Sequence, residues 1–169
     1  AGILSSNGML INHVSNGSNY NRLRTNVLTD TLLCSPFGGR DIPISEPIDL
    51  TDDNAVAEAI NNQTECVGCH QAMDPIAAHY WVFRSRLTPF QVNTAYDGDH
   101  NCTDLSLNIS CYPVEMYSTI VADLWQDKGL RPPNYWGATT TDMADVGQHI
   151  AADPRFSLCA AQRFSSYLT

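Results

Sequence analysis

Residues 66–75 read CVGCHQAMDP, and the first part of this stretch decides which fold to expect. It forms the pattern Cys-x-x-Cys-His, which is the attachment signature of c-type haem. Two thiols one helical turn apart can each form a thioether with a vinyl group of one porphyrin, and the His after the second Cys then lies beneath the iron as its proximal ligand. The pattern therefore predicts that Cys66, Cys69 and His70 hold one covalent haem c.

Two other interpretations of the paired thiols have less support in the sequence. A thioredoxin-like redox pair needs a βαβ pattern around the motif, and no such strand pattern flanks residues 66–70. A zinc site needs a second Cys or His pair at ligand spacing, and the sequence offers none. Haem attachment is the leading prediction, with zinc or a redox dithiol as its alternatives.

Four further cysteines lie outside the motif: Cys34, Cys102, Cys111 and Cys159. Cys102 and Cys111 are close in a polar segment, which favours a local disulfide, and Cys34 and Cys159 then pair by elimination. Four cysteines allow three pairings, and buried free thiols are the alternative. Disulfides persist outside the cytoplasm, where c-type haem is also attached, so we expect a periplasmic or extracellular bacterial protein.

Length and charge narrow the classes of partner. The chain has 169 residues, which fits one domain of roughly 100–200 residues. It carries 9 Lys and Arg against 18 Asp and Glu, a formal charge of −9 that disfavours nucleic acid and favours a basic redox partner. No apolar run approaches the roughly 18 residues that a membrane span needs.

The pattern of apolar and capping residues predicts one all-α, cytochrome c-like helical haem domain over residues 1–169, with long disulfide-stapled loops. Residues 1–50 are expected to form an N-terminal loop, one helix and a Pro-rich connector, and residues 51–169 the haem-binding helical core. The helices are expected at residues 21–34, from 51 into the haem motif, at 74–87, 113–129, 142–152 and 153–168.

The haem motif and several flanking segments resemble the planctomycete-type c-type cytochromes, whose C-terminal module carries Cys-x-x-Cys-His-x-x-Met/Ile-Asp-Pro. The other matching segments are GILS at 2–5, LLC at 32–34, GLRPP at 129–133, and AADPRF at 151–156 with Cys159. The resemblance spans nearly the whole chain and implies a covalent haem and an extracytoplasmic setting, but no substrate. Residues 76–79 depart from the family pattern, and the usual upstream modules are missing, so we expect a C-terminal portion or a minimal relative.

The second axial ligand of the iron is less well specified than His70. A low-spin electron carrier needs Met or His there. Met143 is the preferred candidate because it starts a helix after a Gly/Thr loop. The alternatives are His13, Met116, His100, a residue of another chain, or an open site.

Other side chains are candidates for the surroundings of the haem. Three aromatic residues are expected to form an apolar wall, with ordinary helix packing as the alternative: Tyr80, Trp81 and Phe83. Three arginines are candidates for pairing with propionates, against the alternative of solvated or salt-bridged positions: Arg84, Arg86 and Arg131.

The function expected from these residues is single-electron transfer by a monohaem c-type cytochrome, an electron carrier rather than an enzyme. One alternative is the cytochrome module of a haem enzyme with an open distal position, although no distal His/Arg pair at a familiar spacing supports it. Another alternative is a subunit of a polymeric assembly that conducts electrons between neighbouring haems.

Overall fold

The computed structural model describes residues 2–13, 20–38, 47–49, 51–83, 122–123, 125–126 and 130–168. The described part is mostly helical, which confirms the expected class, and it adds one two-stranded ribbon that the all-α prediction missed. Its elements in chain order are η1 (Ile3–Ser5), α1 (Asn7–Asn12), α2 (Arg22–Leu33), α3 (Asp53–Asn62), α4 (Thr64–Ala78), η2 (His79–Val82), β1 (Asn134–Tyr135), β2 (Ala138–Thr139), α6 (Met143–Ala152) and α7 (Pro154–Ser166).

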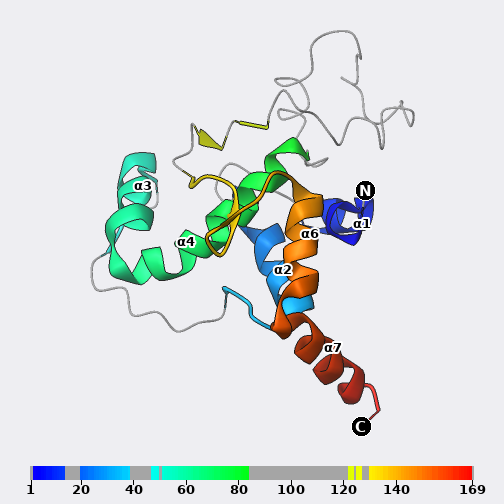
Figure 1. Cartoon of the computed structure of the whole chain (residues 1–169). Helices are drawn as coiled ribbons and strands as arrows, with labels where there is room; N and C mark the ends of the chain where they lie inside the picture. Colours follow the sequence, from blue (N-terminus) through cyan, green and yellow to red (C-terminus); the bar gives the residue numbers. More distant parts are fainter. Residues whose placement is uncertain are drawn as a thin grey trace, which may run out of the picture.

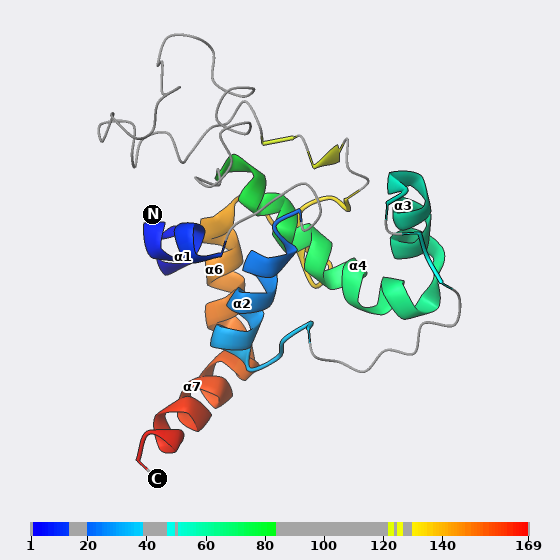
Figure 2. The ribbon, with the colours of Figure 1, turned by 180° about the vertical axis from the view of Figure 1, so that it is seen from behind.

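The core lies where α2, the C-terminal half of α4 and α6 meet (Figure 1). α2 packs against both α4 and α7, and α3 packs against α4 at the far end of the molecule from α6 (Figure 2). The buried hydrophobic cluster consists of Leu10, Leu28, Leu33, Ile76, Tyr80, Tyr135, Met143, Val146 and Ile150. Residues before position 50 therefore contribute to the same core as residues after it.

Three aspartates begin helices where the sequence predicts them. The carboxylate of Asp52 accepts hydrogen bonds from the backbone N–H groups of Asn54 and Ala55, and Asp142 caps α6 in the same way. Asp153 caps α7, with Pro154 in the first helical position. Local side-chain-to-backbone bonding is enough to fix these starts.

Three expected boundaries are wrong. The helix that begins at Asp53 ends at Asn62, and the haem motif lies on a separate helix, α4, which begins after the extended residue Gln63. α4 then runs through Pro75 to Ala78, so Asp74-Pro75 starts no new helix. Residues 1–20 contain η1 and α1 instead of loop alone, because the Ser6 side chain caps the Met9 N–H.

α2 buries only part of the face that its apolar residues predict. Leu28 on that face is buried, but Leu23 on the same face is 42% exposed, and the polar Arg24 is fully buried. The Arg24 guanidinium donates hydrogen bonds to the carbonyls of Leu10, His13 and Phe83 and to the side-chain oxygen of Asn21, at 2.8–3.1 Å. Burial lowers the pKa of Arg24 to about 10, so the group remains charged at neutral pH.

A tight turn joins β1 and β2 ahead of α6. Trp136 and Gly137 both have positive φ, 46° and 91°, which is the conformation that a short hairpin turn requires. The ribbon places Tyr135 against the His149 ring, and its hydroxyl donates to Asp153 at 2.7 Å. At the end of α7 the apolar periodicity of the sequence predicts buried Phe164 and Tyr167, but both are largely exposed.

His79 gives the fold a pH-dependent contact. Its Nε2 lies 2.6 Å from the Thr140 hydroxyl, and burial lowers the pKa of His79 below its ordinary value, although Asp142 and Asp145 act in the opposite direction. The unfolded chain therefore binds a proton more readily than the folded one below about pH 6.5. We expect the free energy of unfolding to fall as the pH drops through this range, and His79→Gln to lessen that dependence. Urea titrations at several pH values measure it, and equal pH slopes in the two proteins would contradict it.

Candidate functional site

The two thiols of the motif project from α4 one turn apart. Cys66 and Cys69 are the free cysteines of the described part of the chain, and both are partly buried. Burial raises the pKa of Cys66 above its ordinary value, with a smaller contribution from the nearby charge of Glu65. A redox dithiol needs a lowered pKa. The direction of this shift gives the redox-dithiol alternative no support.

The described residues also offer little support for zinc. Among them, no group of three or more His, Cys, Asp or Glu side chains is arranged to hold a metal ion. A structural zinc site needs four such ligands. Covalent haem attachment needs fewer protein groups than such a zinc site, because it uses two thiols and one imidazole from consecutive turns of one helix.

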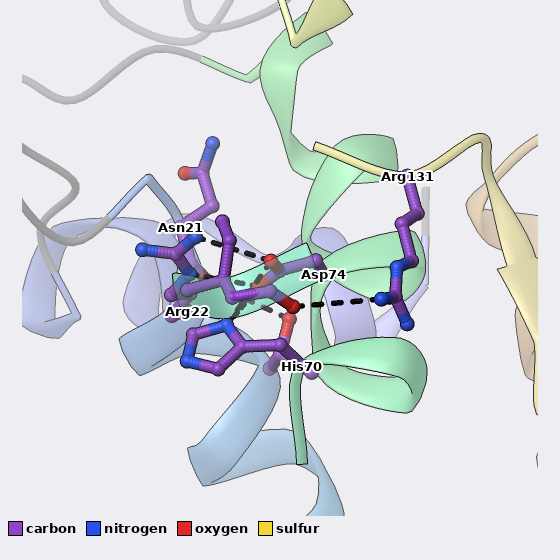
Figure 3. Close-up of polar contacts among 7 residues, drawn as sticks. Asn21, Arg22, His70, Asp74 and Arg131 are labelled. Carbon is purple, nitrogen blue, oxygen red and sulfur yellow. Dashed lines mark hydrogen bonds and ion pairs between the residues drawn. The ribbon is translucent and has the colours of Figure 1, made fainter. Parts of the chain in front are cut away.

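His70 is the part of the motif with the most specific surroundings. Its Nδ1 lies 3.1 Å from both carboxylate oxygens of Asp74, one turn further along α4. Arg22, the first residue of α2, donates from Nε to one of these oxygens at 2.7 Å and from Nη2 to the other at 3.1 Å. Figure 3 shows both side chains directed at the Asp74 carboxylate. The three residues thus form a chain of charge-assisted hydrogen bonds across two helices.

The Asp74 carboxylate that faces His70 Nδ1 is buried and charged. The Asp74 side chain is 2% exposed. Burial alone would raise the pKa of Asp74, but the hydrogen bonds from His70 and Arg22 outweigh it and lower the pKa. An ionised carboxylate accepts hydrogen bonds only, so a hydrogen bond between the two groups requires the proton on His70 Nδ1. In the neutral imidazole Nε2 then keeps its lone pair, which is the form that a metal ligand needs.

Two unusual backbone positions present Arg22 to α4. Tyr20 and Asn21 both have positive φ, 44° and 65°, and they turn the chain directly into α2. The Arg22 guanidinium lies 5.2 Å from the Tyr20 ring centroid, and that ring stacks on Trp81 at 6.4 Å. The site therefore continues from His70 through Arg22 to an aromatic pair.

The candidates for the second axial ligand that the structure describes, Met143 and His13, lie on helices other than α4. Met143, the preferred distal ligand, is buried in the core cluster, where it packs at the start of α6. His13 ends α1, and its carbonyl accepts a hydrogen bond from Arg24. The remaining candidates lie outside the described residues: Met116, His100, Arg84, Arg86 and the expected Cys102–Cys111 pair. The identity of the second axial ligand stays a prediction.

Of the residues expected around the haem, the structure gives contacts or burial for Tyr80, Trp81 and Arg131. Tyr80 is fully buried in the core, and its hydroxyl donates to the Leu4 carbonyl at 3.2 Å, so it has an ordinary packing role. The Trp81 Nε1 is buried and has no hydrogen-bond partner among the described residues. Arg131 donates to the Ile60 carbonyl at the end of α3, at 3.4 Å.

Sequence reasoning missed Arg22 and misassigned Asp74. The spacing of His70 and Asp74, one helical turn apart, was a usable signal once the helix was taken to continue through Pro75. No comparable signal pointed to Arg22, which is 52 residues from Asp74 along the chain.

The comparisons with known proteins add no relative. The scan against protein-family models and the searches of curated proteins and of solved structures found no match. In the part of the chain that the structure describes, every helix is too short or too polar to cross a lipid bilayer.

Proposed function

We propose that this chain is a monohaem c-type cytochrome that carries single electrons outside the cytoplasm. The observation that carries the proposal is His70, whose Nδ1 is engaged by Asp74 so that Nε2 is the free ligand atom, directly after two free thiols on the same helix. When bound, the haem supplies an iron that gains and loses one electron.

Each residue has a distinct task in this proposal. Cys66 and Cys69 would form the two thioethers and thereby fix the haem to α4. His70 would hold the iron through Nε2, and Asp74 orients its ring. Arg22 neutralises part of the charge of Asp74. The chain's formal charge of −9 favours a basic protein as the redox partner.

The Cys34–Cys159 disulfide supports an oxidising compartment as the site of this function. The likeness to planctomycete-type c-type cytochromes agrees with that compartment. A periplasmic or extracellular location and a cytochrome c-like identity are therefore parts of the same proposal.

Export of the chain to a bacterial periplasm that contains c-type haem attachment enzymes tests the proposal. We expect one covalent haem per chain, seen as haem stain on a denaturing gel and as the matching mass increase. Cys66→Ala/Cys69→Ala is expected to abolish the stain completely, because no thioether can then form. Thr64→Ala on the same helix is the matched control and is expected to keep it.

A wild-type chain that folds in this compartment without covalent haem would contradict the proposal. Spectra of the loaded chain then separate the carrier from its alternatives. Low-spin spectra in both oxidation states and no carbon monoxide binding support an electron carrier. Carbon monoxide binding favours the open-site haem enzyme, and filaments in electron micrographs favour the polymeric assembly.

A further inference from the structure

Asp74 is a fully charged partner for the imidazole that follows the two attachment thiols. It is a buried carboxylate, and both of its oxygens lie 3.1 Å from His70 Nδ1. A backbone carbonyl or a water molecule in that place would accept the same proton with only a partial charge. A full negative charge draws the Nδ1 proton more strongly and increases the basicity of Nε2.

Arg22 makes this arrangement sustainable. A lone carboxylate with a 2% exposed side chain is costly to ionise, and the two hydrogen bonds from Arg22 offset that cost. The Arg22 guanidinium and the His70 ring both reach the Asp74 carboxylate, and each contacts both of its oxygens (Figure 3). Arg22 therefore helps to keep Asp74 charged while His70 Nδ1 stays within hydrogen-bond distance of it.

We infer that Asp74, supported by Arg22, is a positioning residue that holds His70 as the Nδ1-protonated tautomer and makes it a strongly electron-donating ligand. For the haem-loaded chain this inference rests on the proposed function. A more basic imidazole stabilises the oxidised iron over the reduced iron, so the pair lowers the reduction potential. The role of the pair is thus to set the direction of electron flow toward acceptors of higher potential.

The tautomer is measured in the full chain without haem, so that this result is independent of haem attachment. Nitrogen-15 NMR of the His70 ring distinguishes a protonated Nδ1 from a protonated Nε2. We expect the Nδ1-protonated form in wild type and a loss of about tenfold in its ratio to the other tautomer in Asp74→Asn. A merely structural ion pair between α2 and α4 would leave this ratio unchanged.

The potential is measured in the haem-loaded chain by redox titration. We expect Asp74→Asn to shift the equilibrium about tenfold toward the reduced protein, which is about 59 mV in midpoint potential for one electron. Arg22→Gln is expected to shift it in the same direction by less, because the buried Asp74 carboxylate then loses the two hydrogen bonds that offset the cost of its charge. Asp153→Asn is the matched control, since it breaks the Asp153–Arg155 ion pair, and it is expected to leave both readouts unchanged.

The outcomes are separable. An Nε2-protonated His70 in wild type, or an unchanged tautomer ratio in folded Asp74→Asn, overturns the inference. An unchanged potential in Asp74→Asn overturns its redox part. If Asp74→Asn fails to fold, the wild-type tautomer and the Arg22→Gln potential decide. A chain that never receives haem refutes the proposed function, while the tautomer still tests the role of Asp74.

Discussion

Replacing Arg24 with Met is expected to lower the free energy of unfolding by about 3–5 kcal/mol. The substitution keeps an unbranched apolar stem but removes every donor of a fully buried guanidinium. Three backbone carbonyls and the side-chain oxygen of Asn21 then lose their hydrogen bonds. Leaving a buried polar group unpaired costs about 1–3 kcal/mol, so the sum is large even if water reaches some of them.

Arg24→Lys separates charge from geometry. A lysine keeps the positive charge but cannot donate along the fork that a guanidinium offers, so we expect it to recover only a minority of the loss. Arg163→Met is the surface control, because that side chain is 46% exposed and its removal is expected to cost less than about 1 kcal/mol. Urea denaturation followed by circular dichroism gives the free energy of unfolding of the wild type and of the three variants. An Arg24→Met protein as stable as Arg163→Met would refute the structural role.

Arg24 also shows why the packing of α2 escaped prediction from sequence. Apolar periodicity assigns a buried face by side-chain type, and it therefore favoured Leu23. The actual face is decided by the carbonyls at the ends of α1 and η2, which the Arg24 side chain satisfies from the neighbouring helix. Those carbonyls are far from residue 24 or belong to a segment expected to be a loop. A pattern within one helix contains no information about them.

The starts of α3, α6 and α7 were predictable for the opposite reason. Asp52, Asp142 and Asp153 each bond backbone N–H groups two or three residues away, so the whole interaction is contained in a short stretch of sequence. The capping rule failed at Asp74. Its carboxylate bonds the side chains of Arg22 and His70 instead of the backbone N–H groups that follow it in the sequence. A long-range ion pair replaced the local cap.

In the candidate site, too, the local part could be predicted from the sequence and the long-range part could not. Cys66, Cys69 and His70 are recognised by their spacing alone, since one helix contains all three. The environment that prepares His70 is made by tertiary structure, and Arg22 enters it only when α2 packs against α4. The sequence therefore predicts which atoms would hold a haem, and the fold determines how strongly His70 would donate to it.

Loss of the Cys34–Cys159 disulfide is expected to cost about 5 kcal/mol in the chain-entropy model, because the bond closes a loop with a sequence separation of 125. Cys34 ends α2 in the left-handed conformation, and Cys159 is the buried residue of α7. The rest of α7 is held by its packing against α2, by Phe156 against the core, and by Arg163, which donates to the Asp30 carbonyl at 2.7 Å, while Phe164 and Tyr167 stay exposed. The disulfide is therefore the covalent attachment of this projecting helix to α2 (Figure 1).

Cys34→Ser tests this with the Cys159 sulfur still in place, and Cys34→Ser/Cys159→Ala adds the small cavity that the second substitution leaves. We expect the first variant to show most of the loss in urea denaturation, together with faster amide hydrogen exchange along α7 than along α6. The cavity adds about 1 kcal/mol or less, because only one sulfur atom is removed from the packed site. If Cys34→Ser stays within about 1 kcal/mol of wild type, the α2–α7 contact is held by packing and not by the bond, since relief of chain entropy in the unfolded state would otherwise appear in full.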